Sequence, residues 1–400
     1  MANEFKTNLK TDLVALRFAE GAKYLTAGSK KYFKDQLKGK RNGTTYRFVI
    51  RDAGEYQTGI SLEHASDLVE RFVDKSMHYG NVVIDTNIVQ KITDVDWDRE
   101  VAIPNGKKLV NGTVADAIKA DLGLQNTAFV GAGWMPLTKA TGFLRSISSE
   151  ARYGFVDPMI DSILAAAGKS WETVNAEPID SEGLLGKWNG TQFYDTQFLP
   201  SVEISEELAA ELGSATVTSY ATGDNYDTLT LTGVTETIPA GTPIFVNGIY
   251  ACDLVGDKTS AKKAFIAIED AAAGVVKVAK NFDNISRGTR GLCMADGSDV
   301  KLTDFADATI KGPEAGDYFL GIVRLDGAME FDVLDELDTS NADTKYGKNE
   351  GITVVEQRAI DVMAGSNKTR WTVASVAGIV EPRAVSLVLI KDQNPNLVVC

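Results

Sequence analysis

Hydrophobic positions near the N-terminus recur with the period of a helix. Over residues 9–27, Leu9, Leu13 and Leu16 stand four and three positions apart, which places them on one face of a predicted helix. The same spacing predicts helices over 107–130 and 136–147, and Asp157-Pro158 predicts the start of another, with Asp as its N-cap and Pro at its first position.

Short runs with period two predict strands in both halves of the chain: 44–50, 68–75, 81–86, 318–325, 328–334 and 384–390. We interpret 68–75 and 81–86 as one long hairpin, and 318–325 with 328–334 as a second hairpin around Asp326-Gly327. A long hairpin with mixed faces buries itself poorly, so we expect the first one to lie on something else. The polar residues 335–351 are predicted to form a loop.

The middle of the chain has a different pattern, with short β-branched runs separated by turn residues. The turn at Pro239-Ala240-Gly241 is typical of this stretch, which spans residues 213–300. Strands at this spacing predict a small barrel or sandwich. The candidate strands are 216–220, 228–234, 244–251, 264–268 and 275–279.

Composition makes the chain a soluble globular protein, with 44% hydrophobic and 24% charged residues. Without an apolar run of about 18 residues we expect no transmembrane helix, and the N-terminal residues do not resemble a signal peptide. The cysteines are odd in number and far apart, which favours a reducing compartment over a disulfide framework. They are Cys252, Cys293 and Cys400.

Charge is unevenly distributed along the sequence. Residues 1–50 hold 11 Lys+Arg and 4 Asp+Glu, a net charge of +7, and since the whole chain carries −14 the other 350 residues carry −21. A basic arm on an acidic body binds nucleic acid or a membrane, pairs with the acidic body of a neighbouring copy, or is simply solvated. The arm lacks the interleaved aromatic residues of nucleic-acid readers.

The search for catalytic or metal chemistry is mostly negative. Residues 93–100 have the D-x-D-x-D spacing of a calcium loop, but Arg99 and Asn105 stand where Gly and Glu are needed. Neither His64 nor His78 sits beside a nucleophile turn, and no hydrolase, zinc or dinucleotide motif occurs. A catalytic pair of carboxylates stays an open alternative, because the 55 Asp and Glu residues allow many such pairs in space. We therefore expect no enzyme, no cofactor and no metal.

The residues alone thus predict an α+β protein with a basic arm, an exposed hairpin and an inserted β domain. Elements that cannot bury themselves are expected to bury against neighbours. This combination favours a protein that assembles with copies of itself.

The order of segments resembles the major capsid protein of tailed bacteriophages with the HK97-like fold, in particular the coat proteins of short-tailed phages with a β-barrel insertion domain. FKTNLKTDLVALRFAEGAKYL resembles the N-arm, and TTYRFVI with LVERFVDKSMHYGNVVIDT resembles the E-loop hairpin. KKLVNGTVADAIKADLGLQNTAFVGAG resembles the spine helix of the P domain, and LLGKWNGTQFYDTQFLP resembles the A domain before the insertion. IPAGTPIFVNGIYACD resembles the insertion barrel, and TRWTVASVAGIVEPRAVSLVLI the strands that return to the P domain.

The resemblance implies an HK97-like division of the chain into domains. In order these are the N-terminal arm 1–43, the E-loop hairpin region 44–92, the P domain spine helix 93–135, the first part of the A domain 136–212, the inserted β-barrel 213–300, the second part of the A domain 301–370, and the return strand and tail 371–400.

The resemblance also implies a function, namely a major capsid protein whose hexamers and pentamers form an icosahedral shell around double-stranded DNA. The implied partners are copies of itself, a scaffolding protein, a portal, a decoration protein and the packaged DNA, with no membrane; the implied location is the virion, assembled in the host bacterial cytoplasm. A tail or decoration component is the alternative. The predicted interface residues are Lys30, Lys31, Lys34, Lys38, Lys40, Arg41, Arg71, Lys75, His78 and Tyr79.

Overall fold

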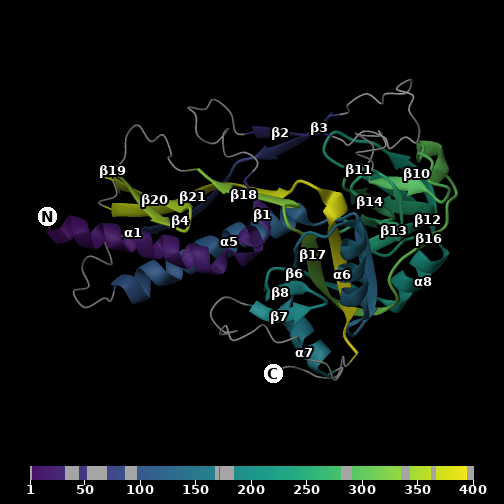
Figure 1. Ribbon diagram of the computed structural model, residues 1–400, viewed down its shortest axis with the longest axis horizontal. Coiled ribbons are helices and arrows are strands. Elements are labelled where there is room, and N and C mark those ends of the chain that lie inside the picture. Colours follow the sequence, from purple (N-terminus) through teal and green to yellow (C-terminus); the bar gives the residue numbers. More distant parts are fainter. Residues whose placement is uncertain are drawn as a thin grey trace, which may run out of the picture. The chain divides into compact units, whose positions relative to one another are not determined.

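The computed structural model describes residues 2–31, 45–51, 70–85, 97–166, 171, 184–280, 291–334, 343–361 and 366–393 (Figure 1). The chain divides into two compact units, which we describe separately. Unit 1 comprises Met1–Phe48, Asp74–Ala120 and Met329–Gly378, and unit 2 comprises Val49–Val73, Asp121–Ala328 and Ile379–Cys400.

Unit 1 is centred on a six-stranded sheet in the order β1-β18-β21-β20-β19, with β4 paired to β21. Strands β19, β20 and β21 are antiparallel neighbours, whereas β1 runs parallel to β18. The strands are β1 Ser29–Lys30, β4 His78–Asp85, β18 Met329–Val333, β19 Asp343–Asn349, β20 Ile352–Asp361 and β21 Ser366–Ile379.

One face of this sheet is covered by α1, whose buried stripe includes Val14, Ala15 and Phe18. The approach is close at Gly347, where a Cβ atom would lie 2.4 Å from the backbone carbonyl oxygen of Thr11. Only glycine leaves room for the helix there. The helices of unit 1 are α1 Ala2–Gly21, α2 Lys23–Thr26, the π-helical turn η1 Trp97–Ala102 and α5 Ile103–Asp121.

Unit 2 contains a seven-stranded mixed sheet in the order β5-β22-β17-β6-β8-β7, with β9 paired to β17. Strand β22, which lies between β5 and β17, is buried from Val385 to Ile390, as expected for an apolar run covered on both faces. Helix α6, Met135–Ile147, packs on β5, β17 and β22, and α7 is Pro158–Ala166. The strands are β5 Thr127–Ala132, β6 Arg152–Val156, β7 Leu184–Trp188, β8 Thr191–Asp195, β9 Ser201–Ile204, β17 Gly316–Leu325 and β22 Val385–Lys391.

Unit 2 also holds a β module, residues 216–311, made of two further sheets. Rings from both sheets and from a short helix meet in one core, where the centroid of Tyr220 lies 6.0 Å from that of Phe265 and 4.4 Å from that of Phe305. Helix α8, Glu206–Ser214, precedes the module, η2 is Leu302–Phe305 and η3 is Pro382–Ala384. The module strands are β10 Thr216–Ala221, β11 Asp227–Thr232, β12 Pro243–Cys252, β13 Lys258–Ile266, β14 Val275–Val278, β15 Leu292–Met294 and β16 Ile310–Lys311.

The remaining two strands, β2 Thr45–Arg51 and β3 Glu70–Ser76, form a two-stranded sheet. Within the described residues neither pairs with a third strand. No helix in the described ranges has the length and apolar character needed to cross a membrane.

Several predicted elements are confirmed. A helix covers most of 9–27, and another covers 136–147. Four of the five strands of the central β region are present with small shifts of their ends, whereas the strand predicted over 264–268 begins six residues earlier, as β13 Lys258–Ile266. The predicted N-cap is also confirmed, because the backbone N–H of Met159 donates to Oδ1 of Asp157 at 2.8 Å.

Four local predictions were wrong. The helix predicted over 107–130 ends at Asp121, because Gly123 adopts φ +95° and the chain then enters strand β5. The strands near 68–75 and 81–86 do not pair with each other: β3 pairs with β2, and β4 with β21. Likewise β17 and β18 belong to different sheets, and the predicted loop 335–351 contains strand β19.

Candidate functional site

The predicted interface residues of the arm lie only partly in the described chain. Lys30 is exposed in β1, and Lys31 directly follows it. The ammonium of Lys31 lies 3.0 Å from Oδ1 of Asp332, whose side chain is almost fully buried. Lys31 therefore already neutralises a buried carboxylate of its own chain. The remaining arm residues, Lys34, Lys38, Lys40 and Arg41, lie outside the described residues.

The other predicted residues fall on consecutive strands. Arg71 and Lys75 belong to β3, and His78 and Tyr79 begin β4. Because side chains alternate along a strand, His78 and Tyr79 point to opposite faces. His78 Nε2 lies 2.9 Å from Oδ2 of Asp116 in helix α5, whereas Tyr79 is 45% exposed. The structure thus separates two residues that the sequence grouped together.

A surface missed by the sequence analysis surrounds Tyr79. The alternating exposed positions of β4 are Tyr79, Asn81 and Val83, and the exposed positions of the adjacent strand β21 include Lys368 and Arg370. We call these five residues the β4 surface. The period-two patterns of HYGNVVID and NKTRWTV indicate which positions of each strand are exposed, but they do not indicate that the two strands pair with each other.

The opposite face of the same sheet holds a buried carboxylate, Glu356. Its Oε2 accepts hydrogen bonds from the hydroxyl of Thr11 at 2.6 Å and from the indole N–H of Trp371 at 3.2 Å, and its Oε1 accepts from Nε of Arg358 at 2.8 Å. Thr11 and Trp371 are fully buried. A buried charge is tolerated only when it is paired and hydrogen-bonded, so this network fixes helix α1 on the sheet.

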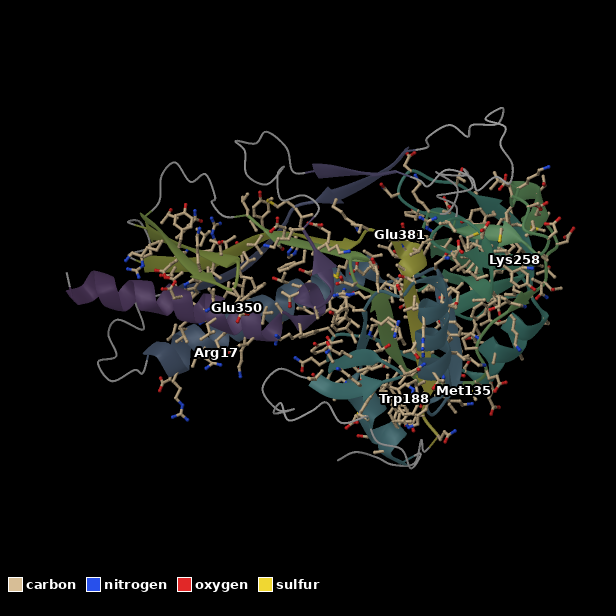
Figure 2. The ribbon with its side chains drawn as sticks, in the orientation of Figure 1. Arg17, Met135, Trp188, Lys258, Glu350 and Glu381 are labelled. Atoms are coloured by element: carbon tan, nitrogen blue, oxygen red, sulfur yellow. The ribbon has the colours of Figure 1, made fainter. Side chains whose placement is uncertain are left out.

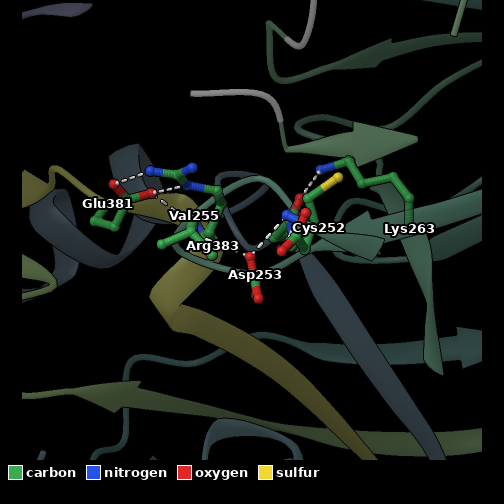
Figure 3. Close-up of polar contacts among 8 residues, drawn as sticks. Cys252, Asp253, Val255, Lys263, Glu381 and Arg383 are labelled. Carbon is green, nitrogen blue, oxygen red and sulfur yellow. Dashed lines mark hydrogen bonds and ion pairs between the residues drawn. The ribbon is translucent and has the colours of Figure 1, made fainter. Parts of the chain in front are cut away.

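In unit 2 a buried lysine joins the β module to the large sheet. The ammonium of Lys263 donates to Oδ1 of Asn126 at 2.9 Å, and the backbone N–H of Asn126 contacts the carbonyls of Pro382 and Val385. Burial lowers the pKa of Lys263 to about 7, against the opposing effects of nearby Cys252 and Asp227. Figure 3 shows Lys263 extending toward Cys252 and the Glu381–Arg383 ion pair in the same region.

An aromatic cluster lies at the start of α6. The ring centroid of Trp134 is 4.2 Å from that of Trp188 and 4.9 Å from that of Trp171, and Trp171 also contacts Phe193 at 5.0 Å. Met135, which follows Trp134, is 59% exposed (Figure 2). The cluster packs the β7–β8 hairpin against α6.

None of these arrangements carries recognisable catalytic chemistry. Among the described residues no group of three or more His, Cys, Asp or Glu side chains is arranged to hold a metal ion. Cys252 and Cys293 are buried thiols that form no disulfide bond within the described residues.

Comparison with known proteins gave structural matches only. No family model matches the chain, and no curated protein matches it. The fold is similar to solved capsid structures of phages. The capsid of Ralstonia phage GP4 matches with a TM-score of 0.44 and 8% identity over 89% of this chain and 86% of that chain.

Two further matches have the same character. The capsid of Helicobacter pylori bacteriophage KHP30 gives a TM-score of 0.43 and 9% identity, covering 88% of this chain and 84% of that one. The capsid of cyanophage P-SCSP1u gives 0.39 and 12%, covering 92% and 90%.

Proposed function

We propose that the chain is the shell-forming subunit of a tailed-phage capsid. The observation that carries this proposal is the two-stranded sheet β2–β3, which pairs with no third strand among the described residues. A two-stranded sheet is marginal alone, so it needs a partner surface, and a shell of repeated copies supplies one.

The charge distribution supports the same proposal. The segments of unit 1 hold 22 Lys+Arg and 20 Asp+Glu, a net charge of +2, which leaves unit 2 with 19 against 35 of the chain's 41 and 55, a net charge of −16. A chain with one weakly basic and one strongly acidic unit is suited to contacts between unlike units of neighbouring copies.

In finer detail, we propose an HK97-like subunit that forms hexamers and pentamers of an icosahedral shell. The β module corresponds to the insertion domain, and the arm with Lys34, Lys38, Lys40 and Arg41 meets either an acidic neighbour or double-stranded DNA. A scaffolding protein, a portal and a decoration protein complete the proposed virion, which is assembled in the host cytoplasm. The protein acts without catalysis.

A tail or decoration component is the alternative, and particle shape separates the two. Electron microscopy of the purified chain, alone and after addition of lysate from its natural source to supply a scaffold, should show closed shells or rings of five and six subunits. Rods or open tubes would favour a tail component. A chain that stays monomeric under both conditions would contradict the proposed function.

A further inference from the structure

The β4 surface combines exposed apolar side chains with cations. Val83 is 57% exposed and Tyr79 is 45% exposed, and both belong to the small set of exposed large apolar side chains in the described chain. In the strand register Val83 lies opposite Arg370 and Asn81 lies opposite Thr372. An exposed patch of this kind marks an interaction site more often than an isolated apolar residue does.

The two cations of this surface have no carboxylate partner recorded among the described residues. Nε of Arg370 donates to Oε1 of Gln357 at 3.1 Å, so a neutral amide holds its guanidinium in place. Lys368 stands opposite Asp85 in the register. The side chain that holds the guanidinium of Arg370 therefore carries no negative charge.

The position of β4 in its sheet adds a second feature. Within the described residues, β4 pairs with β21 alone. Among the described residues the other edge of this eight-residue strand has no strand partner, and such edges accept further contacts. Tyr79, Asn81 and Val83 lie on the same strand as this edge.

We propose that the β4 surface is a docking site for the acidic unit 2 of a second copy of this chain. Charge complementarity decides the occupant, because unit 2 carries −16 and the two cations are presented beside apolar anchors. Tyr79 and Val83 are buried at the water-free centre of the contact, and Lys368 and Arg370 orient the partner by pairing with its carboxylates. The proposal rests on the proposed function, since it names a contact by which shell subunits associate.

Nucleic acid is the less favoured occupant of this surface. DNA binding by charge alone typically uses about six or more phosphate contacts, whereas the β4 surface offers two cations. An exposed valine contributes nothing to phosphate binding but does contribute to a protein interface. The charge and the apolar area therefore point together to a protein partner.

Carbodiimide crosslinking tests the contact directly, since it joins lysine amines to carboxylates that they touch. Full-length chains labelled with ¹⁴N and ¹⁵N are mixed, assembled and crosslinked, so that mixed-isotope peptides report contacts between copies. We expect Lys368 to be joined to an Asp or Glu of unit 2 in mixed-isotope form. Crosslinks of Lys368 confined to its own chain, or none at all, would overturn the proposal.

Charge reversal provides the second test. The double substitution Lys368→Glu with Arg370→Glu should weaken association about tenfold. The control, Lys107→Glu with Lys108→Glu, makes the same charge change at two exposed positions of α5 in the same unit and should leave association within about twofold. An equal loss of association in both double variants would show that the effect depends on net charge alone, which would overturn the docking site.

Further outcomes separate this inference from the proposed function. Shells from the Lys368 and Arg370 double variant at the wild-type yield would overturn the docking site and leave the capsid proposal intact. Failure of the wild-type chain to assemble at all would count against both. Retention of a 100-base-pair duplex by the wild-type chain, lost in the double variant but not in the control, would assign the surface to nucleic acid instead.

Discussion

At the scale of single residues, Glu356 is the clearest anchor of the N-terminal helix. Glu356→Gln should lower the free energy of unfolding by about 2–3 kcal/mol, because an amide replaces a carboxylate that accepts three hydrogen bonds inside the protein. Thr11→Val should lower the free energy of unfolding by about 1–2 kcal/mol, since it removes the hydroxyl that donates to Oε2 of Glu356.

Urea unfolding of both variants checks this prediction. The matched control is Thr26→Val, because Thr26 is an exposed residue whose hydroxyl donates to the carbonyl of Ala22, the N-cap of its own short helix. Its effect should stay within about 0.5 kcal/mol. If Thr11→Val were as mild as Thr26→Val, the network would not anchor the helix.

Lys263 predicts a dependence of stability on pH. Its pKa is about 7 in the folded protein and close to its usual value of 10.5 when unfolded. Below pH 7 both states hold the proton, and between about pH 7 and 10 the unfolded state binds more protons. Stability should therefore rise with pH across this window, by at most about 1.4 kcal/mol per pH unit.

Lys263→Met removes this titration, so its stability relative to the wild type should be greatest near pH 6 and should fall steadily toward pH 10. Urea midpoints at intervals between these values measure the difference, in which titrations common to both proteins cancel. Lys262→Met is the control, because that ammonium is bonded to Asn247 at an exposed site. Parallel pH profiles for Lys263→Met and the wild type would contradict the assignment.

At the scale of elements, the sequence predicts strands and helices better than it predicts their partners. Strands β3 and β4 were found near their true positions, yet only one residue, Met77, separates them and each joins a different sheet. Side-chain periodicity specifies a buried face, but the hydrogen-bonding neighbour depends on distant residues. The same cause explains the mistaken pairing of β17 with β18.

Strand β19 shows a second limit, since DTKYGKN lacks the apolar alternation of a buried strand. It is nonetheless a strand because it extends β20 at the sheet edge and because Gly347 admits the backbone of α1 at Thr11. Neither condition is visible locally. Exposed positions such as Lys368 and Arg370 were missed for the same reason, because the pairing of β21 with β4 places them beside Tyr79.

Helix α7 illustrates what local sequence does determine. Asp157 was predicted as its N-cap, and its carboxylate accepts from the backbone N–H of Met159. Asp157→Ala should cost about 1 kcal/mol of unfolding free energy, whereas Asp157→Ser should restore most of it, because serine is a comparable cap. Thermal unfolding compares the variants, and equal losses for alanine and serine would show that the cap contributes little.

At the scale of the whole molecule, the two compact units differ in net charge. The first 50 residues already revealed a basic segment, but only the fold shows that β4, β20 and β21 belong to the same unit as that segment. The resulting division, +2 against −16, is a property of the three-dimensional structure. The capsid resemblance came from the order of segments, whereas the charge division came from how they fold together.

This division predicts how association responds to salt. If unlike units of neighbouring copies meet, raising NaCl from about 50 mM to about 500 mM should weaken association, because screening shortens the reach of exposed charges to a few ångströms. Light scattering at matched protein concentrations measures the effect. The double variant at Lys368 and Arg370 should respond less, since it lacks the attractive term, and the Lys107 and Lys108 control should follow the wild type. Stronger association at high salt in all three proteins would instead identify apolar burial as the driving force, because added salt favours the burial of apolar surface and opposes attraction between charges.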